Sequence, residues 1–297
     1  MVGGPQAEDL GLALGLGLLF WGGAGSARVV RHVRYLPSLT PADFGLPYEP
    51  ARLTAGDGVP IECWKIPHSR PAGALVLLHG FGASKADLLD LAKDLHAAFP
   101  FDLLLADLRA HGGSGGRLIS FGLKEVLDVQ AALGALSRDP RTKGLPLGCY
   151  GVSMGGAVAL LAASRCPSIR AVVADSSYAD LGQAIARAQR LTYHIPRVPL
   201  GQAVLWGTEV RLGCRLGALS PERVIGQIAP RPVLIIHGGR DAGVPPEQAR
   251  RLYGAARDPR QLWVVPDAEH AACFYKGREE YVRRVGGFFS DVFLGTA

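Results

Sequence analysis

The segment from Gly151 to Gly155 has the pattern Gly-x-Ser-x-Gly, which places Ser153 between two glycines. An apolar run at 145–150 precedes it and suits a buried strand, and the small residues at 156–163 suit a closely packed helix. A serine on a tight turn between a strand and a helix projects its Oγ out of the sheet. The pattern also occurs in turns that are packed only for shape. The strand and the helix around it therefore carry the prediction that Ser153 is a nucleophile for acyl groups.

A serine hydroxyl attacks a carbonyl when a base takes its proton, and that base needs an acid to orient it. His270 is the candidate base, because it comes soon after the apolar run 262–265. Asp241 is the candidate acid, because it comes soon after the apolar run 233–236. Asp175, at the end of an earlier apolar run, is a competing acid, but Asp241 lies nearer to His270 in the chain. The structural alternatives are an aspartate that caps a turn and a histidine used for packing.

An acyl-transfer site also needs donors for the oxyanion that develops on the carbonyl. The segment 79–84 (His-Gly-Phe-Gly-Ala-Ser) follows an apolar run and precedes a helical pattern. In such a turn we expect the amide of Phe81 to point into the site beside the amide of Met154, at the positive end of the helix after Ser153. The alternative is a glycine-rich turn without a ligand. Neither Gly-x-Gly-x-x-Gly nor a Walker-type lysine occurs here, so we predict no nucleotide. A serine nucleophile with its base and acid needs no metal ion or organic cofactor, so we expect neither.

Alternating strands and helices must hold these residues in place. The predicted strands lie at 52–54, 61–66, 74–78, 103–106, 145–150, 170–174, 233–236 and 262–265. The predicted helices follow Ser84, cover 121–136, follow Ser153, open at Pro246 and cover 279–293. This alternation predicts an α/β fold with a mostly parallel central sheet and helices on both faces.

Residues 179–230 break the alternation, because about fifty positions are too many for a crossover helix alone. We interpret them as an inserted helical cap over the carboxyl ends of the strands, where open α/β sheets bind ligands. An ordinary surface excursion with extra helices is the alternative.

The N-terminal segment 1–34 differs in composition from the rest. Residues 10–27 contain no charge, and three arginines follow them: Arg28, Arg31 and Arg34. Eighteen residues can just span a bilayer as a helix, and the positive-inside rule would then place the catalytic domain in the cytoplasm. The alternatives are a signal peptide of an exported protein and an apolar helix docked on a soluble cytoplasmic domain. Residues 35–50 contain four prolines and are expected to be a linker to a domain over 51–297.

The composition excludes several other classes of protein. The chain has 297 residues, 48% of them hydrophobic, and a net charge of +6. Its arginines are scattered without interleaved aromatic residues, so we expect no nucleic-acid partner. The five cysteines are odd in number and widely spaced, which argues against a disulfide scaffold or a zinc site.

Five features resemble the α/β-hydrolase superfamily in order and spacing over roughly 51–293: the His-Gly turn at 79–80, the segment 107–114, the elbow at 151–156, Asp241 and His270. The resemblance implies an α/β-hydrolase fold, a Ser-His-Asp triad, and a supporting role for the segment 107–114. Dehalogenases and epoxide hydrolases of this superfamily use an aspartate nucleophile, so Ser153 argues against both. The most similar members are esterase-like and peptidase-like, some with an N-terminal hydrophobic segment.

We therefore expect a serine hydrolase that cleaves an ester-like acyl bond of a small or lipid-like substrate through an acyl-enzyme. A peptidase or amidase, a thioesterase or an acyltransferase with the same triad is the first alternative. The second is a non-catalytic, membrane-tethered hydrolase-like protein that binds a partner.

Overall fold

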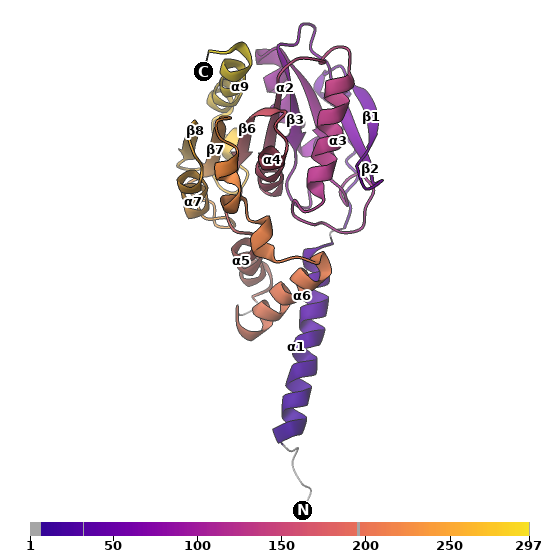
Figure 1. Ribbon diagram of the computed structural model, residues 1–297, viewed down its shortest axis with the longest axis vertical. Helices are drawn as coiled ribbons and strands as arrows, with labels where there is room; N and C mark the ends of the chain where they lie inside the picture. Colours follow the sequence, from indigo (N-terminus) through magenta and orange to yellow (C-terminus); the bar gives the residue numbers. More distant parts are fainter. Residues whose placement is uncertain (1–6, 32, 195–196, 297) are drawn as a thin grey trace, which may run out of the picture.

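A computed structural model describes residues 7–31, 33–194 and 197–296, with side chains from residue 17 onward except those of residues 193 and 197. One eight-stranded sheet runs through the body, in the order β1-β2-β4-β3-β5-β6-β7-β8 (Figure 1). The strands are β1 (Glu49–Thr54), β2 (Pro60–Ile66), β3 (Gly73–Leu78), β4 (Phe101–Ala106), β5 (Leu147–Val152), β6 (Ile169–Asp175), β7 (Val233–Gly238) and β8 (Arg260–Val265). β2 pairs antiparallel with β1 and with β4, and all other neighbours are parallel.

Helices cover both faces of this sheet. The helices in the described part of the chain are α1 (Ala7–Val29), α2 (Leu89–Ala98), α3 (Glu125–Arg138), α4 (Met154–Arg165), α5 (Leu181–Tyr193), α6 (Gln202–Leu212), α7 (Glu247–Ala255), α8 (Cys273–Lys276) and α9 (Arg278–Leu294). Of these, α1, α5 and α6 lie beyond the end of the sheet rather than on its faces (Figure 1). Shorter helical turns lie at Pro41–Phe44, Lys85–Leu88, Arg197–Gly201, Leu216–Leu219, Pro221–Arg223 and Ile225–Gln227.

Successive residues of the central strands point to opposite faces, so each strand feeds two cores. Val76 belongs to the core that includes residues of α3, α4 and α7. Its neighbour Leu77 belongs to the core that includes residues of α2 and α9. Both side chains are fully buried. The predicted mostly parallel sheet with helices on both faces is confirmed, and the continuous apolar runs reflect burial on both sides.

The helix predicted over 121–136 begins four residues later than expected, at Glu125. The carboxylate of Glu125 accepts hydrogen bonds from the amides of Ser120 and Gly122, both at 2.7 Å. These bonds hold the preceding residues in a turn in which Phe121 has a φ of 53°. The apolar spacing is helical across both segments, but the hydrogen bonds to Glu125 hold residues 120–122 in a non-helical turn, so α3 begins after it.

Between β6 and β7 the chain leaves the sheet and forms α5, α6 and four of the short turns. In Figure 1, α5 and α6 lie beyond the end of the sheet, beside α1. Nε of Arg187, on α5, donates a hydrogen bond to the carbonyl of Ala242 at 2.7 Å. This bond ties the predicted cap to the loop that carries Asp241. Residues 195–196 of the cap lie outside the described residues.

Helix α1 packs closely against α6 through glycines. A Cβ on Gly22 would lie 2.8 Å from the carbonyl oxygen of Ala203, and one on Gly207 would lie 2.5 Å from that of Gly22. Nε of Arg211 donates a hydrogen bond to Oγ of Ser26 at 2.8 Å. The part of α1 around residues 22–26 is thus docked on α6, as one of the three alternatives for this segment expected, and the N-terminal half of α1 projects beyond α6 (Figure 1).

No helix in the part of the chain that the structure describes is both long and apolar enough to cross a membrane. The prediction that residues 10–27 span a bilayer is therefore not supported. The side chains of residues 10–16 lie outside the described ones. From Gly17 onward, α1 is a continuous helix that contains several glycines and packs against α6 at Gly22 and Gly25.

Candidate functional site

Ser153 occupies a sharp turn between β5 and α4. Its φ of 53° and ψ of −118° lie outside the regions that serine normally adopts, which is typical of a nucleophile elbow. A Cβ on Gly151 would lie 2.1 Å from the carbonyl oxygen of Gly155, and one on Gly155 would lie 2.4 Å from that of Leu78. Both glycines are therefore required by close contacts with backbone atoms that cannot move aside easily.

Replacing Gly155 with alanine is expected to destabilise the protein by about 2 kcal/mol or more, because the new methyl group would meet two backbone carbonyls. The matched control is Gly287→Ala in the middle of α9, where a Cβ would meet no atom within 4 Å. We expect this control to be as stable as the wild type or more stable, by up to about 1 kcal/mol. Urea unfolding midpoints measure both changes. Equal midpoints for the two variants would contradict the tight packing of the elbow.

The structure brings Ser153, His270 and Asp241 together in a hydrogen-bonded chain. Oγ of Ser153 lies 2.9 Å from Nε2 of His270, and Nδ1 of His270 lies 2.6 Å from Oδ2 of Asp241. Because a carboxylate only accepts hydrogen bonds, Nδ1 of His270 donates to Asp241. Nε2 is then left to accept the proton of the serine hydroxyl. The geometry suits proton transfer from Ser153 to His270.

Asp241 is buried, and its carboxylate is held from several sides. Its Oδ1 accepts a hydrogen bond from the amide of Val244 at 2.7 Å, and Nε2 of His237 lies 3.4 Å from its Oδ2. Burial alone would raise the pKa of Asp241, but the hydrogen bonds of His237, His270 and Val244 lower it to about 2. Asp241 is therefore a fixed negative charge at every pH at which an esterase is normally measured.

The competing acid, Asp175, lies elsewhere. It is buried beneath the site, where its carboxylate accepts hydrogen bonds from Tyr281 at 2.6 Å and from Oγ of Ser176 at 2.8 Å. Burial raises the pKa of Asp175. Its backbone carbonyl accepts a hydrogen bond from the amide of Ser153 at 2.7 Å, so it supports the elbow through its main chain.

Ser176 and His237 were not predicted as site residues. They connect the loops that follow β6, β7 and β8. Ser176 has a φ of 52°, and its Oγ accepts a hydrogen bond from the amide of Ala271 at 3.2 Å, next to His270. His237 is fully buried, and its Nε2 lies 2.7 Å from the carbonyl oxygen of Val244, across the loop of Asp241. His237 directly follows the apolar run 233–236, and Ser176 follows Asp175 at the end of β6, so a polar residue at the end of an apolar strand was the signal available in the sequence.

The predicted oxyanion turn lies beside Ser153. A Cβ on Gly80 would lie 3.4 Å from the Cβ of Ser153, which places the turn with Phe81 next to the nucleophile. Met154 is the first residue of α4, and the first amides of a helix have no acceptor within the helix. The amides of both predicted donors therefore belong to segments that border the Ser153 side chain.

Two histidines hold this turn. Nε2 of His79 accepts a hydrogen bond from the amide of Leu108 at 3.0 Å, so its Nδ1 donates to the carbonyl of Gly80 at 2.7 Å. Nε2 of His111 accepts from the amide of Gly82 at 3.2 Å. Burial, and then the neighbouring His111, lower the pKa of His79 to about 4. The turn thus depends on a neutral His79.

The protein is expected to lose stability as the pH falls from about 6.5 to about 4, in part through His79. In the unfolded chain a histidine binds its proton below pH 6.5, whereas folded His79 resists protonation down to about pH 4. The unfolded state then binds more protons, so acid favours unfolding, by on the order of 3 kcal/mol at pH 4. Urea unfolding across this pH range should show a shallower pH slope for His79→Gln than for the wild type. Equal slopes would contradict the assignment.

The segment 107–114 supports the site through the hydrogen bonds of Asp107. Asp107 is fully buried, and its carboxylate bonds to the amide of Lys85 at 2.8 Å and to the ammonium group of Lys85 at 2.5 Å. Burial would raise the pKa of Asp107, but Lys85 lowers it below its usual value. The amide of Gly113 donates to the same carboxylate at 2.9 Å. Asp107 therefore fixes the start of the helix after the oxyanion turn to the loop that follows β4.

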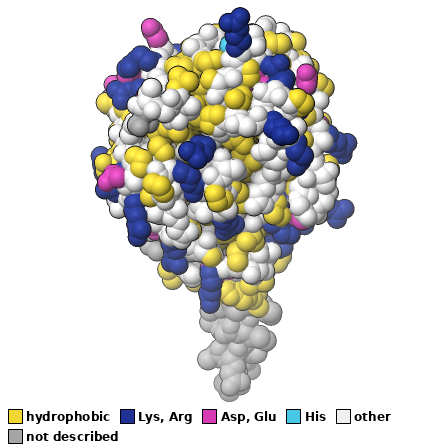
Figure 2. All heavy atoms as spheres, turned by 45° about the horizontal axis from the view of Figure 1, so that its top comes forward, with side chains coloured by type: hydrophobic (Ala, Val, Ile, Leu, Met, Phe, Trp, Pro, Cys, Tyr) yellow, Lys and Arg dark blue, Asp and Glu magenta, His cyan; other side chains and the backbone are white. Residues whose placement is uncertain are grey.

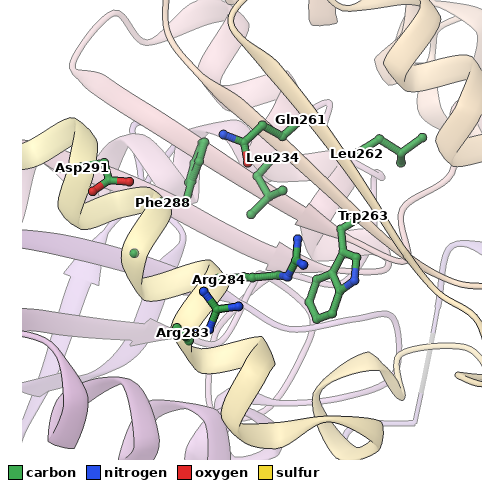
Figure 3. Close-up of a pocket in the computed structure, with 9 residues that line it drawn as sticks. Leu234, Gln261, Leu262, Trp263, Arg283, Arg284, Phe288 and Asp291 are labelled. Atoms are coloured by element: carbon green, nitrogen blue, oxygen red, sulfur yellow. The ribbon is translucent and has the colours of Figure 1, made fainter. Parts of the chain in front are cut away.

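A cavity of about 210 Å³ lies between β8 and α9, and none of its lining residues belongs to the Ser153 site. Figure 3 shows Trp263 on β8 and Arg283 and Arg284 on α9 around it. The guanidinium of Arg284 lies 4.7 Å from the ring centre of Trp263. The polar lining of this cavity and its separation from the nucleophile in the fold do not suit an acyl pocket.

Among the residues that the structure describes, no three His, Cys, Asp or Glu side chains form a group that could hold a metal ion.

Comparisons with known proteins place this geometry in context. A family model described as serine aminopeptidase, S33, matches residues 69–206. YqkD, an uncharacterized protein of Bacillus subtilis strain 168, is 31% identical over 230 residues, which are 76% of this chain and 73% of YqkD. Rv2307c, an uncharacterized protein of Mycobacterium tuberculosis, is 30% identical over 81% of this chain and 80% of its own length. A crystal structure of the Pyrococcus furiosus esterase Pf2001 is 28% identical, with a TM-score of 0.76 over 88% of this chain and 97% of that one.

Proposed function

The chain belongs to the α/β-hydrolase superfamily, and from that membership we propose that it is a serine hydrolase that cleaves ester-like acyl bonds. The observation that carries the proposal is the chain of two hydrogen bonds, 2.9 Å from Ser153 to His270 and 2.6 Å from His270 to Asp241. A serine so connected has a base for its proton and an acid that orients the base.

The proposed reaction has two steps. Oγ of Ser153 attacks the acyl carbon while Nε2 of His270 takes the serine proton, and the protonated His270 then gives that proton to the leaving alcohol. A water molecule, deprotonated by the same histidine, attacks the acyl-enzyme, the bond between the acyl carbon and Oγ of Ser153 breaks to release the acid, and His270 returns its proton to Oγ. Asp241 stabilises the histidinium cation in both steps, and the amides of Phe81 and Met154 hold the oxyanion.

An ester is the first choice of substrate because the solved esterase from Pyrococcus furiosus is similar over almost its whole length. Cleavage of a peptide or amide is the second candidate, since the matching family model describes serine aminopeptidases. Both bonds pass through the same acyl-enzyme, and they differ in the leaving group, an alcohol or an amine that needs the proton of His270 more strongly.

A fluorophosphonate probe tests the proposal directly, because it labels a serine that a neighbouring base activates. We expect one label per chain, located on Ser153 by peptide mass spectrometry, and turnover of p-nitrophenyl esters faster than that of the matching anilides. Faster turnover of the anilides would favour the peptidase alternative. A folded protein that takes no label would contradict catalysis and favour a hydrolase-like binding protein.

A further inference from the structure

Large apolar side chains are exposed at the end of the molecule where α1 meets the inserted helices. They come from α1, α6 and the short turn before α6: Leu19, Phe20, Trp21, Val198, Trp206 and Val210. We call these six residues the tip surface. Phe20 is 72% exposed and Trp206 is 52% exposed. Soluble proteins scatter single apolar residues over their surface, whereas a group of this kind marks an interaction site.

The packing of α1 against α6 gives this surface a fixed shape. Gly22 and Gly207 bring the two helix backbones into contact, and Ser26 and Arg211 add a hydrogen bond between them. The side of α1 that carries Phe20 and Trp21 takes no part in that contact and faces solvent. Phe20 is the most exposed of the three aromatic residues, and about half of Trp21 and of Trp206 remains open to solvent.

Positive charge is concentrated in the same segments. Residues 17–34 and 181–215 together contain eight arginines and one glutamate, a formal charge of +7, whereas the whole chain has +6. The remainder of the chain is therefore nearly neutral. Two of the eight, Arg34 and Arg187, donate hydrogen bonds to the carbonyls of Ser114 and Ala242 on the body of the protein, so six arginines are left to act near the tip surface. Figure 2 shows hydrophobic side chains with basic side chains beside them where the body narrows, next to the part that is drawn grey.

We propose that the tip surface docks on an anionic phospholipid bilayer, with the apolar side chains in the interfacial layer and the arginines against the lipid phosphates. Tryptophan and phenylalanine with basic neighbours are the residues that surface-bound helices use for this purpose. Anionic headgroups also match the local charge, and each arginine near them adds to the attraction. The inserted helices touch the loop of Asp241 through Arg187, so docking would hold the Ser153 site close to the bilayer surface.

Flotation of the full-length protein with vesicles tests this proposal. We expect binding to vesicles of phosphatidylcholine and phosphatidylglycerol at a ratio of 3:1, and at least about tenfold weaker binding to phosphatidylcholine alone. The double variant Phe20→Gln/Trp206→Gln should reduce the partition coefficient at least about tenfold, because two aromatic side chains lose their apolar contact. The matched control is Tyr275→Gln/Leu294→Gln, whose side chains are 62% and 63% exposed away from the tip surface. We expect this control to bind within about twofold of the wild type.

Three outcomes would overturn the proposal. The wild type stays with the solvent, or both double variants lose binding equally, or gel filtration shows a dimer that Phe20→Gln/Trp206→Gln dissociates, which would make the tip surface an interface between two copies. The test is independent of catalysis, since Ser153→Ala should float as the wild type does. The tip variant should in turn hydrolyse a soluble p-nitrophenyl ester within about twofold of the wild-type rate.

Discussion

Replacing Ser153 with alanine is expected to lower kcat for a short p-nitrophenyl ester by about 10⁴-fold or more. The change removes the one oxygen that lies 2.9 Å from Nε2 of His270, and with it the atom that would form the acyl-enzyme. The oxyanion donors and the binding pocket stay in place, so a small rate above that in water should remain. Steady-state kinetics at saturating ester, together with loss of fluorophosphonate labelling, measure the effect.

The matched control for this variant is Ser164→Ala. Ser164 lies on α4, the helix that begins after Ser153, and its Oγ donates a hydrogen bond to the carbonyl of Leu161 at 2.9 Å. Its removal should leave kcat within about twofold of the wild type. Circular dichroism should show both variants folded. A Ser153→Ala protein that keeps more than a tenth of the wild-type activity would assign the acyl group to another residue.

The location of the site could be predicted from the sequence because parallel strands end at the same edge of a sheet. Ser153, Asp241 and His270 each follow the carboxyl end of one such strand, β5, β7 and β8, and neighbouring parallel strands in register bring those ends together. The apolar runs that mark these strands are short. Both faces of β5 and β7 are buried, so their apolar signal is continuous, whereas β8 is an edge strand that is only partly buried.

The hydrogen bonds that align the site could not be predicted in the same way. Ser176 holds the amide of Ala271 over a separation of 95 residues, and Tyr281 reaches Asp175 over 106 residues. Such contacts depend on the packing of α9 and on turns with positive φ, and neither leaves a periodic pattern. The late start of α3 has a similar origin, because the side chain of Glu125 turns back on the preceding amides.

The docking of α1 on α6 could not be predicted from local sequence patterns either. By composition, the apolar segment with its following arginines favoured a membrane span, with a signal peptide and a helix docked on the domain as the alternatives. The structure favours the docked helix, because Gly22 on α1 and Gly207 on α6 lie against each other although the two helices are far apart in the chain. Pairwise complementarity of this kind is a property of two segments together, so one segment read alone does not reveal it.

Replacing Asp241 with asparagine is expected to lower kcat by about 10⁴-fold at pH 7, with little change in stability. With a pKa of about 2, Asp241 is charged at that pH, and its Oδ2 accepts the Nδ1 proton of His270 at 2.6 Å. A neutral amide can neither stabilise the histidinium cation nor keep the proton on Nδ1. Nε2 then carries a proton in the resting state and cannot accept that of Ser153.

Asp175→Asn is the matched control, since it makes the same change in the competing acid. Burial raises the pKa of Asp175, so replacing its carboxylate with a neutral amide changes the charge at this position less than the same replacement does at Asp241. We therefore expect less than a tenfold loss of kcat. Its carboxylate accepts from both Tyr281 and Ser176, and an amide satisfies only one of these donors. The variant should therefore lose about 1–3 kcal/mol of stability, measured by urea unfolding. The opposite pattern, a large loss of kcat for Asp175→Asn and a small one for Asp241→Asn, would transfer the acid role to Asp175.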